Sequence, residues 1–133
     1  CPPSLNMLTL NALVAAQGVI IPVQCEFFAL EGLSALVQTI KKVEKVANKN
    51  LHIEGIVMTM YDSRTTLTTD VSNQLNQHFG KIVYKTAIPR NVRLAESPSH
   101  GLSIFDYDKD SKGAIAYMGL AAEVIRRSKE NLD

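Results

Sequence analysis

The chain has 133 residues, of which 46% are hydrophobic and 20% are charged. That length suits one domain with a buried core, and the composition excludes an intrinsically disordered protein. Fourteen basic and 13 acidic residues leave a formal net charge of +1, which excludes a strongly cationic nucleic-acid-binding protein. No apolar run approaches the roughly 18 residues that a membrane-spanning helix needs.

The chain opens on Cys1, and no signal-peptide pattern follows it. We therefore expect it to begin part-way through a longer protein or after processing. The two cysteines, Cys1 and Cys25, provide neither a disulfide framework nor zinc-ligand spacing, which favours reduced thiols.

The first half of the sequence predicts a helix, a strand and a second helix. The first helix is expected after the Pro2-Pro3-Ser4 turn and through Leu13, and the β-branched run at 18–23 is typical of a strand buried on both faces. Apolar residues then recur every three or four positions from Leu30 to Ala47, which predicts an amphipathic helix. Its other face carries Lys41, Lys42, Lys45 and Lys49.

The second half repeats this alternation. A second strand is expected at 52–61 and a third at 82–88, where Pro89 ends it. Between them, Leu67, Val71, Leu75 and Phe79 recur at i+4 and predict a helix that stops at Gly80.

A last helix is predicted after Ser111, a suitable N-cap. Its apolar repeat is Ile115, Met118, Ala122 and Ile125, and we expect this face to pack on the core. Strands alternating with helices predict a single α/β domain over residues 1–133, with a mostly parallel sheet flanked by helices.

In parallel sheets, ligands bind beyond the carboxyl ends of the strands. Residues 59–62 end the second strand, where the Met60 side chain can pack on a purine ring and the Asp62 carboxylate can accept from base or ribose. The alternative is a turn carboxylate that caps the next helix. Two further segments, 1–4 and 24–28, also lie at expected strand ends, and the first is equally consistent with an ordinary helix N-terminus.

The segment at 89–101 is long for a connection, and such loops are usually functional, although a solvated surface loop is the alternative. It holds Arg90 and Arg93 close to Asn91, within an acid-free stretch from 71 to 95 that also contains Lys81 and Lys85. Several basic groups on one face would suit contacts to a phosphate backbone. The basic residues that end the last helix have a simpler explanation in the helix dipole. The three histidines have no partners at metal-ligand spacing, and no nucleophilic triad is legible.

Five stretches together resemble the ParA/Soj-type chromosome-partition ATPases over essentially the whole chain. They are Cys1-Pro2-Pro3-Ser4-Leu5, Leu10-Asn11-Ala12-Leu13, residues 21–33, residues 59–65 and residues 88–101. The resemblance implies the C-terminal part of a P-loop NTPase fold of the deviant Walker A, SIMIBI type. The Gly- and Lys-rich phosphate loop of that family, and the Asp before its switch turn, have no counterpart in this sequence.

The resemblance also implies roles for particular residues. Met60, Asp62, Pro89 and Asn91 resemble the adenine-side wall of the nucleotide pocket. Pro2, Pro3 and Ser4 resemble the switch that senses the γ-phosphate. Arg64 and Arg93 resemble basic positions used for nonspecific DNA binding, to which the acid-free stretch adds Lys81 and Lys85, and residues 24–32 resemble a segment near the dimer face.

By the same resemblance, the full-length protein is expected to bind ATP and Mg²⁺ and to form a homodimer that binds DNA nonspecifically. A ParB-type partner would stimulate hydrolysis on the nucleoid in the bacterial cytoplasm, with no membrane involved. Without the phosphate loop, this chain alone is expected to bind neither ligand tightly and not to hydrolyse ATP. Two alternatives remain: a non-enzymatic DNA-binding or adaptor module of the same fold, and a MinD-like positioning ATPase fragment.

A sheet that lacks its earlier strands exposes an unpaired edge, which promotes pairing with other chains. We therefore expect the isolated chain to self-associate or to be poorly soluble. A clean monomer at high concentration in sedimentation would contradict this expectation.

Overall fold

The structure is a computed structural model that describes residues 6–132. The switch turn expected at Pro2, Pro3 and Ser4 lies outside these residues. Within them, none of the helices is long and apolar enough to cross a bilayer.

Two parallel strands form the centre of the fold, β1 (Gly18–Gln24) and β2 (His52–Thr59). They pair from Gly18 opposite His52 to Gln24 opposite Thr59, with one irregularity between Val19 and Ile20. Both strands were predicted at these positions, and their parallel direction follows from the helix that connects them.

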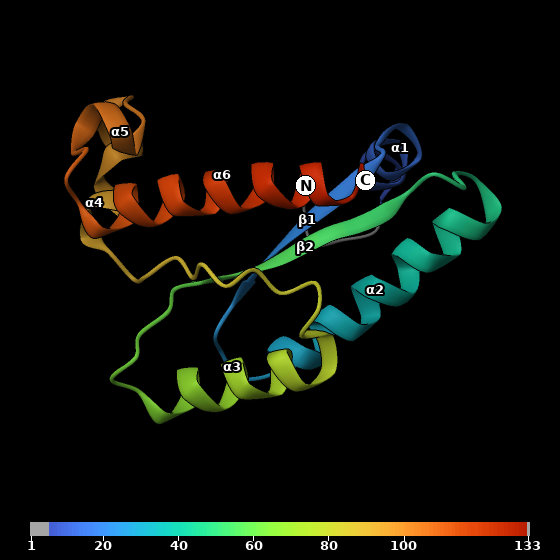
Figure 1. Ribbon diagram of the computed structural model, residues 1–133, viewed down its shortest axis with the longest axis horizontal. Coiled ribbons are helices and arrows are strands. Elements are labelled where there is room, and N and C mark those ends of the chain that lie inside the picture. The colour runs from blue at the N-terminus through green and yellow to red at the C-terminus, as the bar shows by residue number, and fades with distance from the viewer. Residues whose placement is uncertain (1–5, 133) are drawn as a thin grey trace.

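Helices cover both faces of this sheet (Figure 1). On one face lie α2 (Ala29–Val46) and α3 (Thr66–Phe79), while α6 (Lys112–Glu130) crosses the other. A shorter helix, α1 (Met7–Ala15), packs beside α2. This is the α/β architecture, a parallel sheet flanked by helices, that the sequence predicts.

The alternation of side chains along β2 explains the two layers. Ile56 and Met58 belong to a core cluster that includes Leu33, Val37, Ile40 and Val43 of α2 and Val71 and Leu75 of α3. Val57 points the other way, into a smaller cluster with Ala116, Leu120 and Val124 of α6. Each strand residue therefore reaches the helix layer that its position in the pleat dictates.

The third strand predicted at 82–88 is not a regular strand. Two isolated parallel bridges flank it: Val83 pairs with Ile56 of β2, and Pro89 pairs with Tyr61, just beyond the end of β2. Between these bridges the backbone N–H groups of Lys85 and Thr86 turn to the Glu123 carboxylate of α6, at 2.8 and 2.9 Å. A side chain thus takes the amides that a continuous ladder would use, and the prediction of an unbroken strand was wrong for this reason.

The segment at 89–101 is a helical turn and not an open loop. It contains α4 (Val92–Glu96) and a 3₁₀ turn (Ser97–His100). Asn91 caps α4 by accepting the Arg93 backbone N–H at 2.9 Å, and Gly101 ends the turn with a φ of 65°. A further short helix, α5 (Ile104–Tyr107), leads to α6, whose N-cap is Ser111 as predicted.

The expectation about the buried face of α6 was also wrong. Ile115, Met118 and Ile125 are 62%, 60% and 58% exposed, whereas Glu123 is 5% exposed. The helix turns its carboxylate inward because that group satisfies two backbone amides of the neighbouring segment. Apolar spacing alone does not reveal such a partner.

Candidate functional site

The carboxyl end of β2 and the segment that follows residue 88 meet at one edge of the sheet. Tyr61 donates its backbone N–H to the Ile88 carbonyl at 3.0 Å, and Arg90 donates to the Tyr61 carbonyl at 3.1 Å. These two hydrogen bonds place the Met60 turn and the Asp62 turn beside Pro89 and Asn91. The structure therefore brings together the four residues predicted to contact a nucleotide base.

Met60 occupies the left-handed region of backbone conformation, with a φ of 53°. For a residue with a side chain this conformation is strained, and such strain tends to occur at functional turns. The Met60 side chain is 37% exposed. It is therefore an accessible thioether at the edge where a flat ring could pack on it.

Asp62 is engaged by its near neighbour Arg64. Its carboxylate accepts the Arg64 backbone N–H at 3.1 Å and the guanidinium N–H groups at 3.0 and 3.2 Å. The side-chain hydrogen bond from Arg64, followed by the backbone one, holds the pKa of Asp62 below its ordinary value. The cap of α3 is Thr65, which accepts from the Thr68 N–H, so the alternative in which Asp62 caps this helix was wrong.

Asn91 uses only its carbonyl oxygen for the cap of α4. That bond leaves the carboxamide N–H₂ group as a donor for a ligand. Arg90 is exposed beside it, and its charge adds to the lowering of the pKa of Asp62. The edge thus combines a donor, an acceptor and an apolar surface, the chemistry that a purine and a ribose require.

The four predicted DNA-contacting residues do not share one place. Arg64, whose side chain is 88% exposed, and Arg93 lie at the carboxyl edge, and Arg93 pairs with Glu96 at 3.4 Å and Asp108 at 3.5 Å. Lys81 lines a polar cleft with His52 and Glu54 at the amino end of β2. Because β2 has eight residues, the two ends are roughly 25 Å apart. Lys85 is exposed between them.

Among residues 6–132, no three His, Cys, Asp or Glu side chains are grouped so as to hold a metal ion.

The chain is similar in sequence to known proteins over most of its length. A family model described as an AAA domain matches residues 1–53. The sporulation initiation inhibitor protein Soj of Bacillus subtilis is 55% identical over 124 residues, which is 93% of this chain and 49% of Soj. The chromosome partitioning protein ParA of Caulobacter vibrioides is 51% identical over 130 residues, 98% of this chain and 49% of ParA. The chain is a homologue of the ParA/Soj-type partitioning proteins.

Identity of this level extends over nearly all of the chain, but the chain spans about half the length of its ParA/Soj relatives. The fold is also found in a crystal structure of cobyrinic acid a,c-diamide synthase from Mycobacterium smegmatis with bound ADP and magnesium. That structure has a TM-score of 0.74 and 37% identity, and the match covers 98% of this chain and 46% of the synthase. Proteins named for different activities thus share this half, so the half alone does not specify the activity.

Two features of this ParA/Soj homologue were not predicted from its sequence. The first is the ion pair between Asp62, which was predicted to contact the nucleotide, and Arg64, which was predicted to contact DNA. Their separation of only two positions in the sequence could have suggested this pair. The second feature is the exposure of Phe27 and Phe28, 74% and 69%, in the segment 24–28 that was expected at a strand end.

Proposed function

We propose that this chain is the C-terminal part of a chromosome- or plasmid-partitioning ATPase of the ParA/Soj type and supplies the base-side wall of its nucleotide pocket. The observation that carries the proposal is the single edge at which Met60, Asp62, Pro89 and Asn91 meet, held by the Tyr61–Ile88 and Arg90–Tyr61 hydrogen bonds. The identity to Soj and ParA supports the partitioning role.

Each residue has a defined task at this edge. The Met60 thioether packs on the face of the adenine, the Asp62 carboxylate accepts from an exocyclic amine or a ribose hydroxyl, and the Asn91 amide donates to a ring nitrogen. Pro89 shapes the turn between them. ATP with Mg²⁺ supplies the phosphoryl group, and the residues that hold the phosphates belong to the part of the full-length protein that precedes this chain.

The remaining steps of the proposal concern partners. The full-length protein forms a homodimer with ATP, binds DNA nonspecifically through Arg64 and Arg93, and is switched off by hydrolysis that a ParB-type protein stimulates. It acts on the nucleoid in the bacterial cytoplasm. A modest net charge suits weak binding by a monomer that becomes strong when two copies act together.

The nucleotide role is tested by comparing the isolated chain with the full-length protein. We expect no Mg²⁺-dependent ATP hydrolysis by the 133-residue chain, because it has no phosphate loop. In the full-length protein, Asp62→Ala is expected to weaken ATP binding about tenfold or more, since one charge-assisted hydrogen bond to the ligand is lost. Equilibrium binding of a fluorescent ATP analogue measures this loss.

Asp110→Asn is the control, because Asp110 is an exposed acidic residue outside the proposed edge. The affinity of this variant for the ATP analogue should stay within twofold of the wild type. Hydrolysis by the isolated chain, or unchanged affinity in the Asp62→Ala protein, would refute the assignment of this edge.

The DNA role is tested by replacing Arg64 and Arg93 with alanine in the full-length protein. Each phosphate contact that is lost should lower the slope of log affinity against log salt concentration by about 1. A gel-shift series over salt concentration gives both the affinity and the slope. Lys41→Ala with Lys42→Ala, two exposed lysines of α2, is the matched control.

Nucleotide dependence separates the proposal from its alternatives. DNA binding that needs ATP supports the partitioning ATPase, whereas equal binding with and without nucleotide would favour a non-enzymatic DNA-binding module. Recruitment to anionic vesicles in place of DNA would favour a MinD-like positioning protein.

A further inference from the structure

A cation already occupies the carboxylate of the nucleotide edge, the place where Met60, Asp62, Pro89 and Asn91 meet. The Oδ1 atom of Asp62 accepts the Arg64 backbone N–H at 3.1 Å and its Nε–H at 3.0 Å, while Oδ2 accepts an Nη2–H at 3.2 Å. Each carboxylate oxygen has about two lone pairs that accept hydrogen bonds. Oδ1 is therefore fully used, and a ligand donor is directed to Oδ2, where the longest of the three bonds lies.

Arg64 lies on the solvent side of this ion pair. Its side chain is 88% exposed, whereas the Asp62 side chain is 21% exposed. The guanidinium thus covers the carboxylate from outside and has room to leave when a competing donor arrives. An ion pair with so exposed a partner contributes little to stability, because water screens it. The pair can therefore open while the surrounding fold stays intact.

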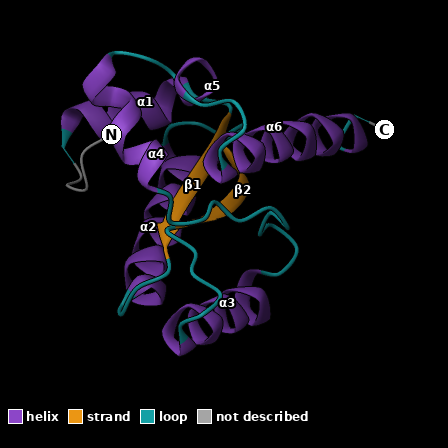
Figure 2. Cartoon of the chain, turned by 90° about the vertical axis from the view of Figure 1, so that its left-hand side faces the viewer, coloured by secondary structure: helices purple, strands orange, loops and turns teal. Residues whose placement is uncertain are grey.

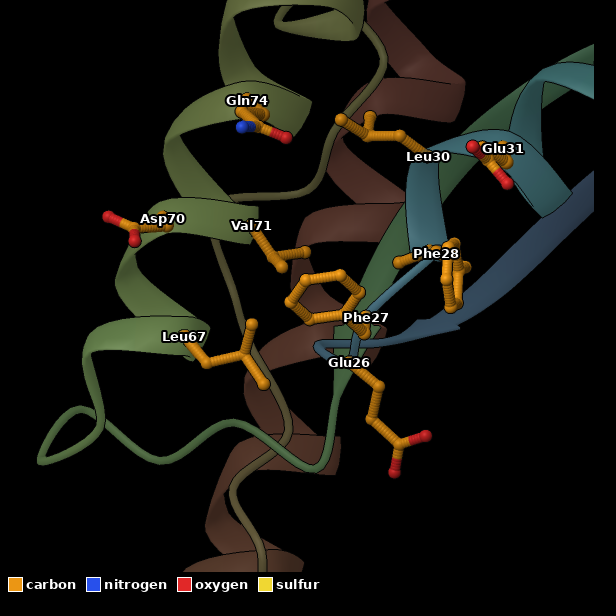
Figure 3. A pocket seen from close by; sticks show the side chains of 10 residues that line it. Glu26, Phe27, Phe28, Leu30, Glu31, Leu67, Asp70, Val71 and Gln74 are labelled. Atoms are coloured by element: carbon orange, nitrogen blue, oxygen red, sulfur yellow. The ribbon is translucent and has the colours of Figure 1, made fainter.

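Asp62 is the one carboxylate that holds Arg64 within residues 6–132. The hydrogen bond to Asp62, followed by the charge of Asp62, raises the pKa of Arg64 above its ordinary value. Glu26 and Asp70 line a groove beside α3, where their carboxylates point away from the apolar side chains between them (Figure 3). Neither is paired with Arg64, so opening the Asp62 contact leaves Arg64 as an unpaired cation.

Arg93 is held by other partners. It pairs with Glu96 at 3.4 Å and with Asp108 at 3.5 Å, and the Tyr107 hydroxyl donates to Glu96 at 2.7 Å. These partners are not among the four residues of the nucleotide edge. A ligand at that edge therefore competes for the partner of Arg64 and leaves the partners of Arg93 in place.

We propose that Asp62 is a shared acceptor: a nucleotide takes its carboxylate from Arg64, and the released guanidinium then binds a DNA phosphate. This inference rests on the function proposed above and names the contact that couples its two ligands. The incoming donor is the exocyclic amine of the base or a ribose hydroxyl, and the planar fork of Arg64 suits a phosphate in two-point contact. Because such coupling is reciprocal, DNA that holds Arg64 should tighten nucleotide binding by the same factor.

The test compares DNA binding by the full-length protein with and without ADP. ADP carries the base and the ribose but lacks the γ-phosphate of the proposed ATP-dependent dimer, and sedimentation identifies concentrations at which both samples are monomeric. Anisotropy of a labelled short duplex at low salt gives the affinity. The ADP effect in the wild type, divided by that in Arg64→Lys, should be about two- to fivefold, the range for opening one exposed ion pair.

Arg64→Lys separates release of the cation from the DNA contact. Lysine keeps the positive charge that binds phosphate, but as a point charge it cannot reproduce the two guanidinium bonds to Asp62. The division by this variant also cancels the repulsion that the ADP phosphates add. Arg93→Lys is the matched control, because its partners lie outside the edge, and it should keep the full ADP effect of the wild type.

The Arg64 side chain also reports its own release. Its Nε–H group donates to Asp62, and Nε of Arg93 lies beside Asp108, so both give side-chain signals in a proton–nitrogen correlation NMR spectrum. Each signal is assigned by its loss in the corresponding lysine variant. ADP should shift the Arg64 signal further than the Arg93 signal.

Failure of this coupling and failure of the proposed function give different results. If ADP binds but raises the DNA affinity of Arg64→Lys as much as that of the wild type, the coupling is refuted and the nucleotide edge stands. An unmoved Arg64 signal in the ADP complex has the same meaning. If Asp62→Ala leaves nucleotide affinity unchanged, or Arg64→Ala leaves the salt dependence of DNA binding unchanged, the proposed role of that residue fails, and the coupling fails with it.

Discussion

Replacing Glu123 with alanine is expected to reduce the free energy of unfolding by about 3 to 5 kcal/mol. The Glu123 side chain is 5% exposed and accepts the backbone N–H groups of Lys85 and Thr86 together with the Thr86 hydroxyl at 2.9 Å. It also pairs with Arg127 at 3.0 Å. The variant would leave the amides and the guanidinium without their acceptor, and the cost of unsatisfied polar groups is large in a buried setting.

Chemical denaturation with the linear extrapolation gives this free energy. The control is Glu130→Ala, an exposed acidic residue on the same helix, whose stability should stay within about 0.5 kcal/mol of the wild type. If Glu123→Ala unfolds no more easily than Glu130→Ala, the carboxylate does not hold the 85–86 segment.

The same interaction predicts a pH dependence. Burial would raise the pKa of Glu123, but the N–H groups of Lys85 and Thr86, the Thr86 hydroxyl and the charge of Arg127 outweigh burial and lower it below 4.5. A carboxyl with a lowered folded-state pKa stabilises the fold above its unfolded-state pKa and loses that contribution as pH falls through the folded-state value. The stability difference between wild type and Glu123→Gln should therefore be constant near neutral pH and shrink below about pH 4.5.

Replacing Gly55 with alanine is the second large effect, with an expected loss of about 3 kcal/mol in the free energy of unfolding. A Cβ at this position of β2 would clash with the Cε2 and Cζ atoms of the Tyr84 ring. Tyr84 cannot move aside easily, because it is 1% exposed and the Arg127 guanidinium lies over its ring. The Cζ atom of Arg127 is 4.5 Å from the ring centroid. The strand or the ring must therefore shift from its packed position.

Gly32→Ala provides the matched control, because no atom lies within 4 Å of the added Cβ and the residue is in the body of α2. Alanine in a helix should stabilise the protein by about 0.5 to 1 kcal/mol. A double-mutant cycle of Gly55→Ala with Tyr84→Ala should show a smaller combined loss than the sum, since removal of the ring relieves the clash. If the two losses of unfolding free energy simply add, the destabilisation by Gly55→Ala does not come from a clash with the Tyr84 ring.

Local patterns predicted much of the fold. The spacing predicted that Leu30, Leu33, Leu36 or Val37, Ile40, Val43 and Ala47 share the apolar face of α2. Of these, Leu33, Val37, Ile40 and Val43 are buried and belong to the main core cluster. The same spacing failed for α6. There the inward residue is Glu123, whose partners lie 37 and 38 positions earlier in the chain, and no local period encodes so distant a contact. The broken third strand has the same cause.

The candidate edge was predictable because parallel strands end at the same side of a sheet. That rule predicted that the segments 59–62 and 89–101 lie at one edge, and the resemblance to the ParA/Soj family singled out Met60, Asp62, Pro89 and Asn91 within them. It could not place Lys81, which lies at the opposite end of β2, since charge clustering in sequence does not specify which end of a strand a residue follows. The segment 24–32 was singled out, but the exposure of Phe27 and Phe28 within it was not predicted, because apolar residues are expected inside and the left-handed φ of 65° at Phe28 is not visible in the sequence.

The contact between Glu123 and the 85–86 segment also sets an order of events during synthesis. The segment cannot complete its native hydrogen bonds until residue 123 has left the ribosome, at least 37 residues after Thr86. At about 5 to 20 residues per second, this interval is roughly 2 to 7 s. During this interval the side of β2 near Gly55 lacks its contact with α6, the helix that lies beside β2 in Figure 2. For this period, chaperones or other nascent chains can bind to the exposed side of the sheet.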